Sequence, residues 1–266
     1  MGGIMVEWRG ERRTPQRCMA ELALPERGRR EGAWRAVNER YLRERDRIDA
    51  LFDEQLALRH RMAQNAGYES YRAFRFAEMG RFDYSPEDCT RFHDAAGEVA
   101  GPLLRESQEE RRRRLDLGQL RPWDLEAELR GTTPEPLFAT QEELIDLVRS
   151  VLGRVDRRFA AEFELLVGEG MLDLMSREGK APGGYNCLLE DVRLPFIFFN
   201  AVGRPEDLRT LLHEAGHAFH SLAARDLPLI EYRHAPLEFC EVASMSMELF
   251  GLERLGEVID PSGRRR

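Results

Sequence analysis

The amino-acid sequence predicts a mainly α-helical fold with one small β-sheet. Apolar residues recur at spacings of three, four or seven along most of the chain, as they do on the buried face of a helix. Helix-start signals precede two of these stretches, at Ser85 and at Thr140. Residues 194–200 instead combine aromatic and β-branched residues in the way that is typical of a strand.

The composition limits the partners that the chain can bind. Its 266 residues carry a formal net charge of −8, which argues against non-specific binding to nucleic acid. No apolar run approaches the roughly 20 residues that cross a bilayer, and the N-terminus shows no secretory signal. We therefore expect a cytoplasmic protein that binds neither nucleic acid nor membrane; its oligomeric state stays open. Four widely separated cysteines are expected to be reduced: Cys18, Cys89, Cys187 and Cys240.

In the first half of the chain, residues 34–64 are expected to form one long helix, with Gly67 as its stop. Ser85 then caps a second helix, which has Pro86 at its first position. This second helix should kink or end at Pro102, because proline lacks a backbone N–H and clashes with the preceding turn. The apolar stripes of both helices are expected to face the core: Trp34, Val37, Tyr41, Ile48, Leu51, Leu58, Met62, Phe92, Ala96 and Val99.

In the second half, Thr140 and Glu143 form a capping box at the start of one helix, and another helix is expected around Phe163. A glycine-rich loop at residues 177–185 then leads to the strand at residues 194–200. The predicted segments are an N-terminal extension at 1–33, a helical lobe at 34–170, a core at 171–257 and a frayed tail at 258–266. The core holds His-Glu-Ala-Gly-His at 213–217, a pattern typical of a helical zinc site, and is therefore the predicted zinc-binding catalytic core.

Residues 213–217 have the sequence His-Glu-Ala-Gly-His, the HExxH pattern. Because His213 and His217 are four residues apart, one face of a helix can present both imidazoles to a single zinc ion. Glu214 follows the first histidine directly and can act as a general base toward water without binding the metal itself. His220 lies close to the same face, where we expect it to support the ligands rather than to bind the ion.

A catalytic zinc site needs a third protein ligand and one open position. A third histidine six residues after His217 is excluded, because that position is Ala223. The acidic candidates further on are Glu231, Glu238, Glu241 and Glu248. Spacing favours Glu241, in a helical stretch whose small residues allow a close approach, and Glu238 is its rival. The predicted fold class is thus a mainly α, helical zincin (gluzincin) lobe with a small β-sheet beside the HExxH helix.

Four segments are similar in sequence to one known family. They are Arg-Glu-Gly-Lys-Ala-Pro-Gly-Gly-Tyr at 177–185, Pro-Phe-Ile-Phe-Phe-Asn at 195–200, Thr-Leu-Leu-His-Glu-Ala-Gly-His-Ala-Phe-His at 210–220 and Glu-Phe-Cys-Glu-Val-Ala-Ser-Met-Ser-Met-Glu at 238–248. In them the chain resembles the thimet-oligopeptidase-like M3 metallopeptidases, and specifically the oligoendopeptidase F branch. The resemblance implies one zinc ion on His213, His217 and Glu241, with Glu214 as the general base. It also implies a helical, cleft-bearing fold that cleaves oligopeptides.

Members of that family are considerably longer than this chain. The resemblance implies, beyond the third ligand, a helical region whose His and Tyr residues stabilise the oxyanion. Here 25 residues follow Glu241, and none of them is His or Tyr. We therefore expect a chain that is truncated at both ends, binds zinc and turns over peptide poorly, because oxyanion donors contribute strongly to the rate.

Further expectations concern residues around the ion. The strand that ends at Asn200 and Ala201 is expected either to pair with the backbone of an extended substrate or to be a core strand. Tyr185 and Lys180, the only lysine of the chain, should contact substrate or lock the glycine-rich loop, and locking is favoured. Glu248 is expected to orient a ligand histidine by a hydrogen bond.

Two other functions stay open at this point. One is a dipeptidyl carboxypeptidase-like gluzincin, whose cleavage would depend on the end group of the substrate. The other is a non-catalytic helical interaction protein with a vestigial HExxH, which would bind no zinc.

Overall fold

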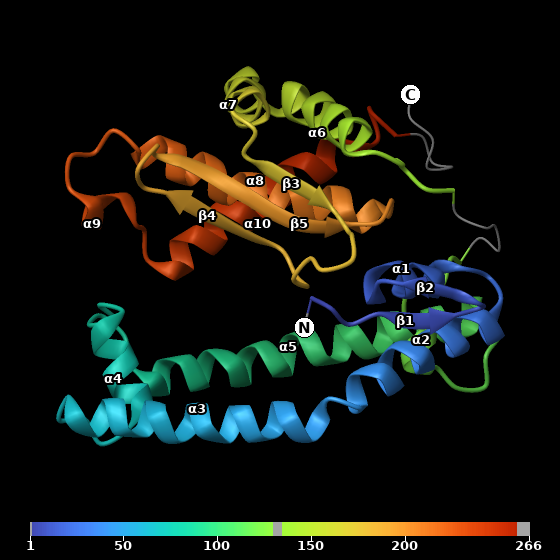
Figure 1. Cartoon of the computed structure of the whole chain (residues 1–266), viewed down its shortest axis with the longest axis horizontal. Helices are drawn as coiled ribbons and strands as arrows, with labels where there is room; N and C mark the ends of the chain where they lie inside the picture. Colours follow the sequence, from blue (N-terminus) through green and yellow to red (C-terminus); the bar gives the residue numbers. More distant parts are fainter. Residues whose placement is uncertain (1, 130–134, 260–266) are drawn as a thin grey trace. The chain divides into compact units, whose positions relative to one another are not determined.

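The structure is a computed structural model in which residues 2–129 and 135–259 are described (Figure 1). The chain is 62% helical with small sheets, which confirms the predicted fold class. It divides into two compact units, one made of Met1–Glu21 with Thr133–Arg266 and the other of Leu22–Thr132. This division differs from the predicted segments. The first 21 residues belong with the HExxH helix, and the predicted lobe at 34–170 is shared between the two units.

The unit Leu22–Thr132 is helical. Its elements are α2 (Arg27–Leu42), α3 (Arg45–Asn65), α4 (Tyr71–Glu78), α5 (Pro86–Arg114) and the 3-10 turn η2 (Pro122–Asp124). The single helix predicted over residues 34–64 is wrong, because the chain breaks between α2 and α3 at Arg43 and Glu44. The apolar spacing continues across this break, so periodicity alone could not reveal it. Gly67, at φ +80°, does follow the end of α3 as predicted.

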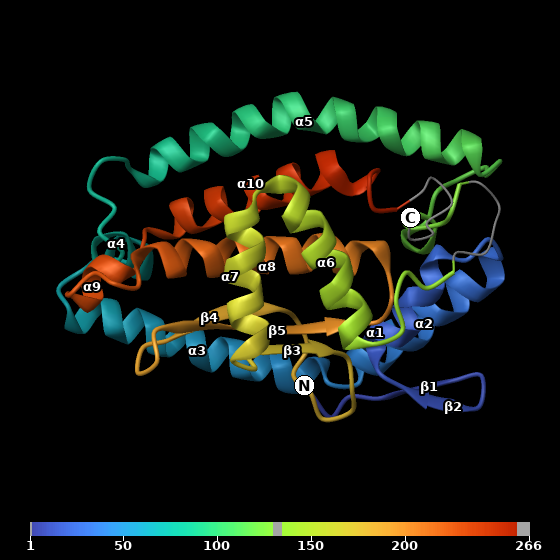
Figure 2. The same ribbon diagram turned by 90° about the horizontal axis from the view of Figure 1, so that it is seen from above.

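The helix α5 starts where the sequence predicts, but it is longer than predicted. The Ser85 hydroxyl accepts the Asp88 N–H, and the Asp88 carboxylate accepts the Ser85 N–H, so the capping box is complete. The helix does not end at Pro102 but continues to Arg114, and Figure 2 shows it as one arched helix. A long helix can thus absorb the lost hydrogen bond of an internal proline by bending.

The predicted core faces of α3 and α5 are largely exposed. Exposure ranges from 40% at Ile48 to 72% at Phe92, and includes Leu51, Leu58, Met62 and Val99. On α2, by contrast, Val37 is buried, and the ring of Trp34 lies 5.5 Å from that of Trp123. Periodicity identifies an apolar face but not the element that covers it, so these core assignments are corrected for α3 and α5.

A buried ion pair ties α2 to η2. Asp124 and Arg30 are almost fully buried, and the Arg30 Nη2 donates to Asp124 Oδ1 at 2.8 Å. Arg27 donates to the same carboxylate through Nε and Nη2, at 3.1 and 2.8 Å. Burial alone would raise the pKa of Asp124, but the hydrogen bonds from Arg27 and Arg30 outweigh it and lower this pKa.

Asp124→Ala should destabilise this unit by about 3–5 kcal/mol, because it leaves the buried Arg30 guanidinium without its charge partner. Urea unfolding followed by circular dichroism measures the loss. Glu31→Ala is the control, since it removes an exposed partner of Arg35 and should cost under about 1 kcal/mol. Equal effects of the two substitutions would contradict the assignment of a buried ion pair.

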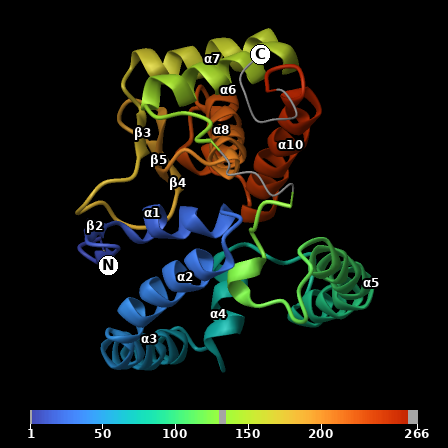
Figure 3. The ribbon, with the colours of Figure 1, turned by 90° about the vertical axis from the view of Figure 1, so that its right-hand side faces the viewer.

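The other unit contains the strand and helix expected around the histidines. Its elements are β1 (Val6–Trp8), β2 (Glu11–Arg13), α1 (Pro15–Met19), α6 (Gln141–Val155), α7 (Arg157–Gly168), β3 (Leu172–Met175), β4 (Tyr185–Leu189), β5 (Leu194–Ala201), α8 (Pro205–Ala224), α9 (Ile230–Arg233) and α10 (Leu237–Leu255). The β3, β5 and β4 strands form a sheet in that order, in which β3 runs parallel and β4 antiparallel to β5. Figure 3 shows α8 between this sheet and α10.

The layers of this unit pack through an apolar core. Thr140 caps α6 in the predicted capping box, and α6 and α7 bury apolar side chains, including Val148 and Phe163. The β5 strand contributes Ile197, and α8 contributes Leu211, both fully buried. The helix α8 therefore enters the core with one face, and the sheet and α10 cover it.

The two ends of the chain also differ from expectation. The N-terminal segment is not a separate extension: Thr14 Oγ1 lies 3.0 Å from Ser176 Oγ, and Arg12 pairs with Glu178. At the other end, Val258 is buried and Ile259 packs on the core, so the predicted frayed tail does not begin at 258. Residues 260–266 of that prediction lie outside the described residues. Among the described helices, none has the length and hydropathy needed to span a bilayer.

Candidate active site

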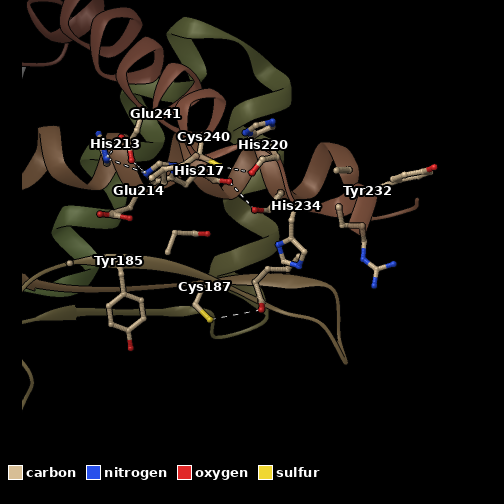
Figure 4. A pocket seen from close by; sticks show the side chains of 18 residues that line it. Tyr185, Cys187, His213, Glu214, His217, His220, Tyr232, His234, Cys240 and Glu241 are labelled. Atoms are coloured by element: carbon tan, nitrogen blue, oxygen red, sulfur yellow. Dashed lines mark hydrogen bonds and ion pairs between the residues drawn. The ribbon is translucent and has the colours of Figure 1, made fainter. Parts of the chain in front are cut away.

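The HExxH residues lie on α8, whose start is fixed by a buried carboxylate. Asp207 Oδ2 accepts the backbone N–H groups of Val202, Gly203 and Arg204, at 2.8 to 2.9 Å. From this start, α8 presents His213 and His217 on one face, with their Nε2 atoms 3.2 Å apart (Figure 4). The two imidazoles therefore point at a common position, as the i, i+4 spacing predicts.

Glu241 reaches the same position from α10. Its Oε2 lies 3.6 Å from His213 Nε2, and its Oε1 lies 3.9 Å from His217 Nε2. The helices can approach this closely because Gly216 faces the backbone of α10. A Cβ at residue 216 would lie 2.6 Å from the Ser244 Cα and 2.8 Å from the Ala243 oxygen. The expected close approach of the two helices is thus present.

These three side chains fit a zinc ion. Zinc with ligand bonds of about 2.0–2.2 Å in tetrahedral geometry separates its ligand atoms by roughly 3.3–3.6 Å. Here the two Nε2 atoms are 3.2 Å apart, Glu241 Oε2 lies 3.6 Å from His213 Nε2, and the other oxygen, Oε1, lies 3.9 Å from His217 Nε2. In the described part of the chain, His213, His217 and Glu241 are the group of potential metal ligands whose donor atoms converge. The donor set of two imidazoles and one carboxylate leaves room for a fourth, open position.

The surroundings of the imidazoles also favour metal binding. Glu248 Oε1 lies 2.7 Å from His213 Nδ1, which leaves Nε2 as the ring nitrogen that faces His217 and Glu241. Burial, and then the nearby His213, lower the pKa of His217, which favours its neutral form. The two Nε2 atoms lie 3.2 Å apart, close enough to bind the same cation. The predicted orienting role of Glu248 agrees with this geometry.

Glu248→Ala should weaken zinc binding by about 10- to 100-fold, because His213 loses the carboxylate that fixes its tautomer and orientation. A competition titration with a chromogenic chelator gives the affinity. Glu253→Ala, at an exposed acid further along α10, should leave it unchanged. An unaltered affinity in Glu248→Ala would show that the hydrogen bond has no effect on the metal.

Glu214 lies beside the ligand atoms but is held apart from them. It is 6% exposed, and its Oε2 is buried without a hydrogen-bond partner in the described residues. Burial raises the pKa of this carboxyl group, and Glu241 adds to the effect. A Cβ at Gly184 would lie 3.5 Å from Glu214 Oε1, so the glycine-rich loop forms the wall next to the carboxylate. A carboxylate with a raised pKa suits proton transfer near neutral pH.

Two of the predicted substrate residues are buried, whereas Tyr185 lines the cavity with the histidines. Asn200 and Ala201 are buried, and the Asn200 amide donates to Ala181 O and Gly183 O, so it holds the loop. Figure 4 shows the Tyr185 ring turned away from the histidines, and this ring stacks on Phe198. These side chains therefore shape the loop and sheet around the site.

A cavity of about 630 Å³ surrounds the convergent side chains. Its wall includes His220, which lies one turn beyond His217 without joining the ligand group, and His234, whose Nε2 lies 2.9 Å from Glu190 Oε1. A second wall is β4, the edge strand of the sheet. The expectation that β5 pairs with substrate is corrected, because β5 is the central strand and its backbone already pairs on both sides.

Sequence reasoning missed β4 and the cavity wall beyond it. The signal for β4 is weak: five residues, Tyr-Asn-Cys-Leu-Leu, after a pair of glycines. Only alternating exposure along the strand marks it, and that pattern becomes visible in the structure. The wall at Tyr232 and His234 lies in a short segment around α9 that has no motif.

Two imidazoles from one helix, a carboxylate from the next and a buried glutamate beside them are the residue types that a metal-dependent hydrolase uses. Residues 21–257 match the model of peptidase family M3. The chain belongs to peptidase family M3.

Known relatives agree with this assignment. The chain is 26% identical over 147 residues to the chromosomal oligoendopeptidase F of Lactococcus lactis subsp. cremoris. The aligned region covers 55% of this chain and 24% of that protein. It is 24% identical over 225 residues to an oligoendopeptidase F homolog of Lactococcus lactis subsp. lactis (strain IL1403), covering 84% of this chain and 36% of the relative.

Solved structures show the same fold. A structure assigned as an oligoendopeptidase F from Bacillus anthracis str. Ames matches with a TM-score of 0.91 at 25% identity, over 98% of this chain and 48% of that one. PZ peptidase A with inhibitor 2 matches with a TM-score of 0.90 at 27% identity, over 96% of this chain and 45% of that one. The chain thus spans less than half the length of these relatives.

Proposed function

We propose that the chain is a zinc metalloendopeptidase that hydrolyses peptide bonds in oligopeptides. The observation that carries this proposal is the meeting of His213, His217 and Glu241 at distances that suit one zinc ion. Membership of peptidase family M3 supports the reaction class. Similarity to proteins named oligoendopeptidase F supports oligopeptides as substrates.

In this proposal His213, His217 and Glu241 hold the ion. When bound, zinc supplies Lewis-acid chemistry to water and to the scissile carbonyl group. The chain's own contribution is the placement of Glu214. Its buried Oε2 has no other partner among the described residues, so it can take a proton from the attacking water.

Glu214 also completes the proton balance of the reaction. The hydroxyl group of the water forms the new bond to the carbonyl carbon, and the C–N bond breaks. The proton held on Glu214 Oε2 then moves to the leaving amine nitrogen. The burial of Glu214 supports both transfers, because a raised pKa makes the carboxyl group a usable acid as well as a base.

Substrate alignment follows from the edge of the sheet. The β4 strand pairs with β5 on one side, and it lines the cavity beside Glu214. An extended peptide can add to such an edge through backbone hydrogen bonds, which do not depend on the peptide's side chains. We infer that the chain accepts peptides of varied sequence, aligned along β4 rather than along β5.

Cleavage of a library of internally quenched fluorescent peptides tests the function. We expect slow cleavage, because the oxyanion donors are missing, and we expect that a chelator abolishes it and added zinc restores it. Peptides with blocked ends should be cut as well as free ones, since an endopeptidase does not need a terminal charge. Dependence on a free C-terminus would indicate a carboxypeptidase instead, and the absence of any zinc-dependent cleavage would remove the proposal.

A further inference from the structure

The chain uses arginine for almost all of its cationic side chains, and Lys180 is its only lysine. The structure places this ammonium in a buried site, where the side chain is 1% exposed. Its Nζ donates to Asp173 O, Met175 O and Asp173 Oδ1, at 2.9, 3.0 and 3.0 Å. An ammonium has three N–H donors, and three oxygens receive them. A planar guanidinium with five donors could not make the same set of bonds in this space.

The same ammonium links the glycine-rich loop to the sheet. It lies 4.5 Å from the centroid of the Phe198 ring on β5. The Tyr185 ring, at the first residue of β4, stacks on Phe198 with centroids 4.9 Å apart. Lys180 thus contacts β3 through Asp173 and Met175, and through Phe198 it reaches the residue at which the edge strand begins.

The loop depends on such anchors because its backbone is permissive. Gly179 and Gly183 have φ values of +83° and +96°, which glycine adopts freely, so the unfolded loop has many conformations to lose. Asn200 supplies the second anchor, by donating to Ala181 O and Gly183 O. The residue after this anchored stretch is Gly184, which lies against Glu214. The loop therefore determines where the wall of the site stands.

We propose that Lys180 is a positioning residue for peptide hydrolysis: its ammonium fixes loop 177–184, which sets both the start of edge strand β4 and the approach of Gly184 to Glu214. This inference rests on the proposed function and assigns Lys180 no contact with substrate. The neighbouring Arg177 does not share the role. It binds the same Asp173 carboxylate, through both oxygens, but from an exposed position with 59% of its side chain accessible.

The test compares Lys180→Met and Lys180→Arg with Arg177→Met, using four measurements on the full chain. These are zinc content, thermal unfolding, affinity of the metal-free protein for a fluorescein-labelled peptide, and kcat and KM with zinc. Both Lys180 variants should keep one zinc, because the ligands lie on α8 and α10. They should weaken peptide binding at least tenfold and lower kcat/KM on the order of 10²-fold, the loss that a misplacement of about 1 Å produces. Arg177→Met should stay within about twofold of the wild type.

The outcomes distinguish a failure of the positioning role from a failure of the proposed peptidase function. A folded Lys180→Met that binds and cleaves peptide like the wild type would overturn the positioning role. A wild-type chain that neither binds nor cleaves peptide would remove the proposed function, and the inference with it. If Lys180→Met does not fold, Asn200→Ala removes the other anchor of the loop. The same tenfold loss of peptide affinity is then expected, and normal affinity would overturn the proposal.

Discussion

Replacing Gly216 by alanine should weaken zinc binding by about 5- to 150-fold, although alanine favours a helix by about 1 kcal/mol over glycine. The added Cβ would lie 2.6 Å from the Ser244 Cα and 2.8 Å from the Ala243 oxygen, both of them backbone atoms. Strain of this kind costs about 1–3 kcal/mol, and moving α10 away from α8 relieves it. That movement takes Glu241 away from His213 and His217, so the strain appears as lost metal affinity.

Gly153→Ala is the matched control for this prediction. Gly153 also lies in a helix, α6, but a Cβ there meets no atom within 4 Å. The control should raise the unfolding temperature slightly and leave zinc binding unchanged. Calorimetric titration with zinc and thermal unfolding measure both effects. If Gly216→Ala bound zinc like the wild type, the close crossing of α8 and α10 would not be what places Glu241.

Glu214→Gln should lower the rate of peptide hydrolysis by about 10²- to 10⁴-fold while the protein still binds one zinc ion. Glutamine keeps the size of the side chain but cannot accept the proton of water. His213, His217 and Glu241 are unchanged, so the metal affinity should not fall. The initial rate on a quenched peptide, measured at equal zinc occupancy, gives the size of the effect.

The result for Glu214→Gln separates two roles of this residue. If zinc is lost together with activity, Glu214 supports the metal site rather than proton transfer. If activity survives at full zinc occupancy, another group acts as the base. Glu206→Gln on the exposed first turn of α8 is the control, and it should behave like the wild type in both measurements.

Local signals predicted the starts and stops of helices well. Ser85 and Thr140 cap their helices through the predicted hydrogen bonds, and Gly67 follows α3 with a positive φ. These signals succeed because the donors and acceptors of a capping box lie within four residues of one another. The break between α2 and α3 gave no such signal, because its apolar spacing continues without interruption.

Burial was harder to predict, since it depends on parts of the protein far apart in sequence. Phe92 on α5 and Leu51 on α3 have the spacing of core residues, yet both are exposed. The helix α10 also exposes many large apolar side chains, each by at least 47%. They are Leu237, Phe239, Val242, Met245, Leu249, Phe250 and Leu252. A sequence shows which face is apolar, and only tertiary structure shows whether that face is covered.

In the candidate site, too, local sequence predicts some residues, and others depend on tertiary structure. The pair His213 and His217 follows from helix geometry alone, so the sequence was sufficient. The choice between Glu241 and Glu238 depended on how α10 crosses α8, which no local pattern encodes. For Lys180 the sequence allows either substrate contact or locking of the loop and favours locking, whereas its three acceptors appear only when β3 and the loop fold together.

Zinc stoichiometry of the wild type, Glu241→Ala and Glu238→Ala tests the central claim most directly. One ion should be held by two imidazoles of α8 and the Glu241 carboxylate of α10, whereas Glu238 lies one turn earlier on α10 and outside the convergent group. After dialysis against buffer without metal, we predict one zinc per chain in the wild type and in Glu238→Ala, and almost none in Glu241→Ala. Full retention of zinc by Glu241→Ala, or its loss from Glu238→Ala instead, would contradict the account.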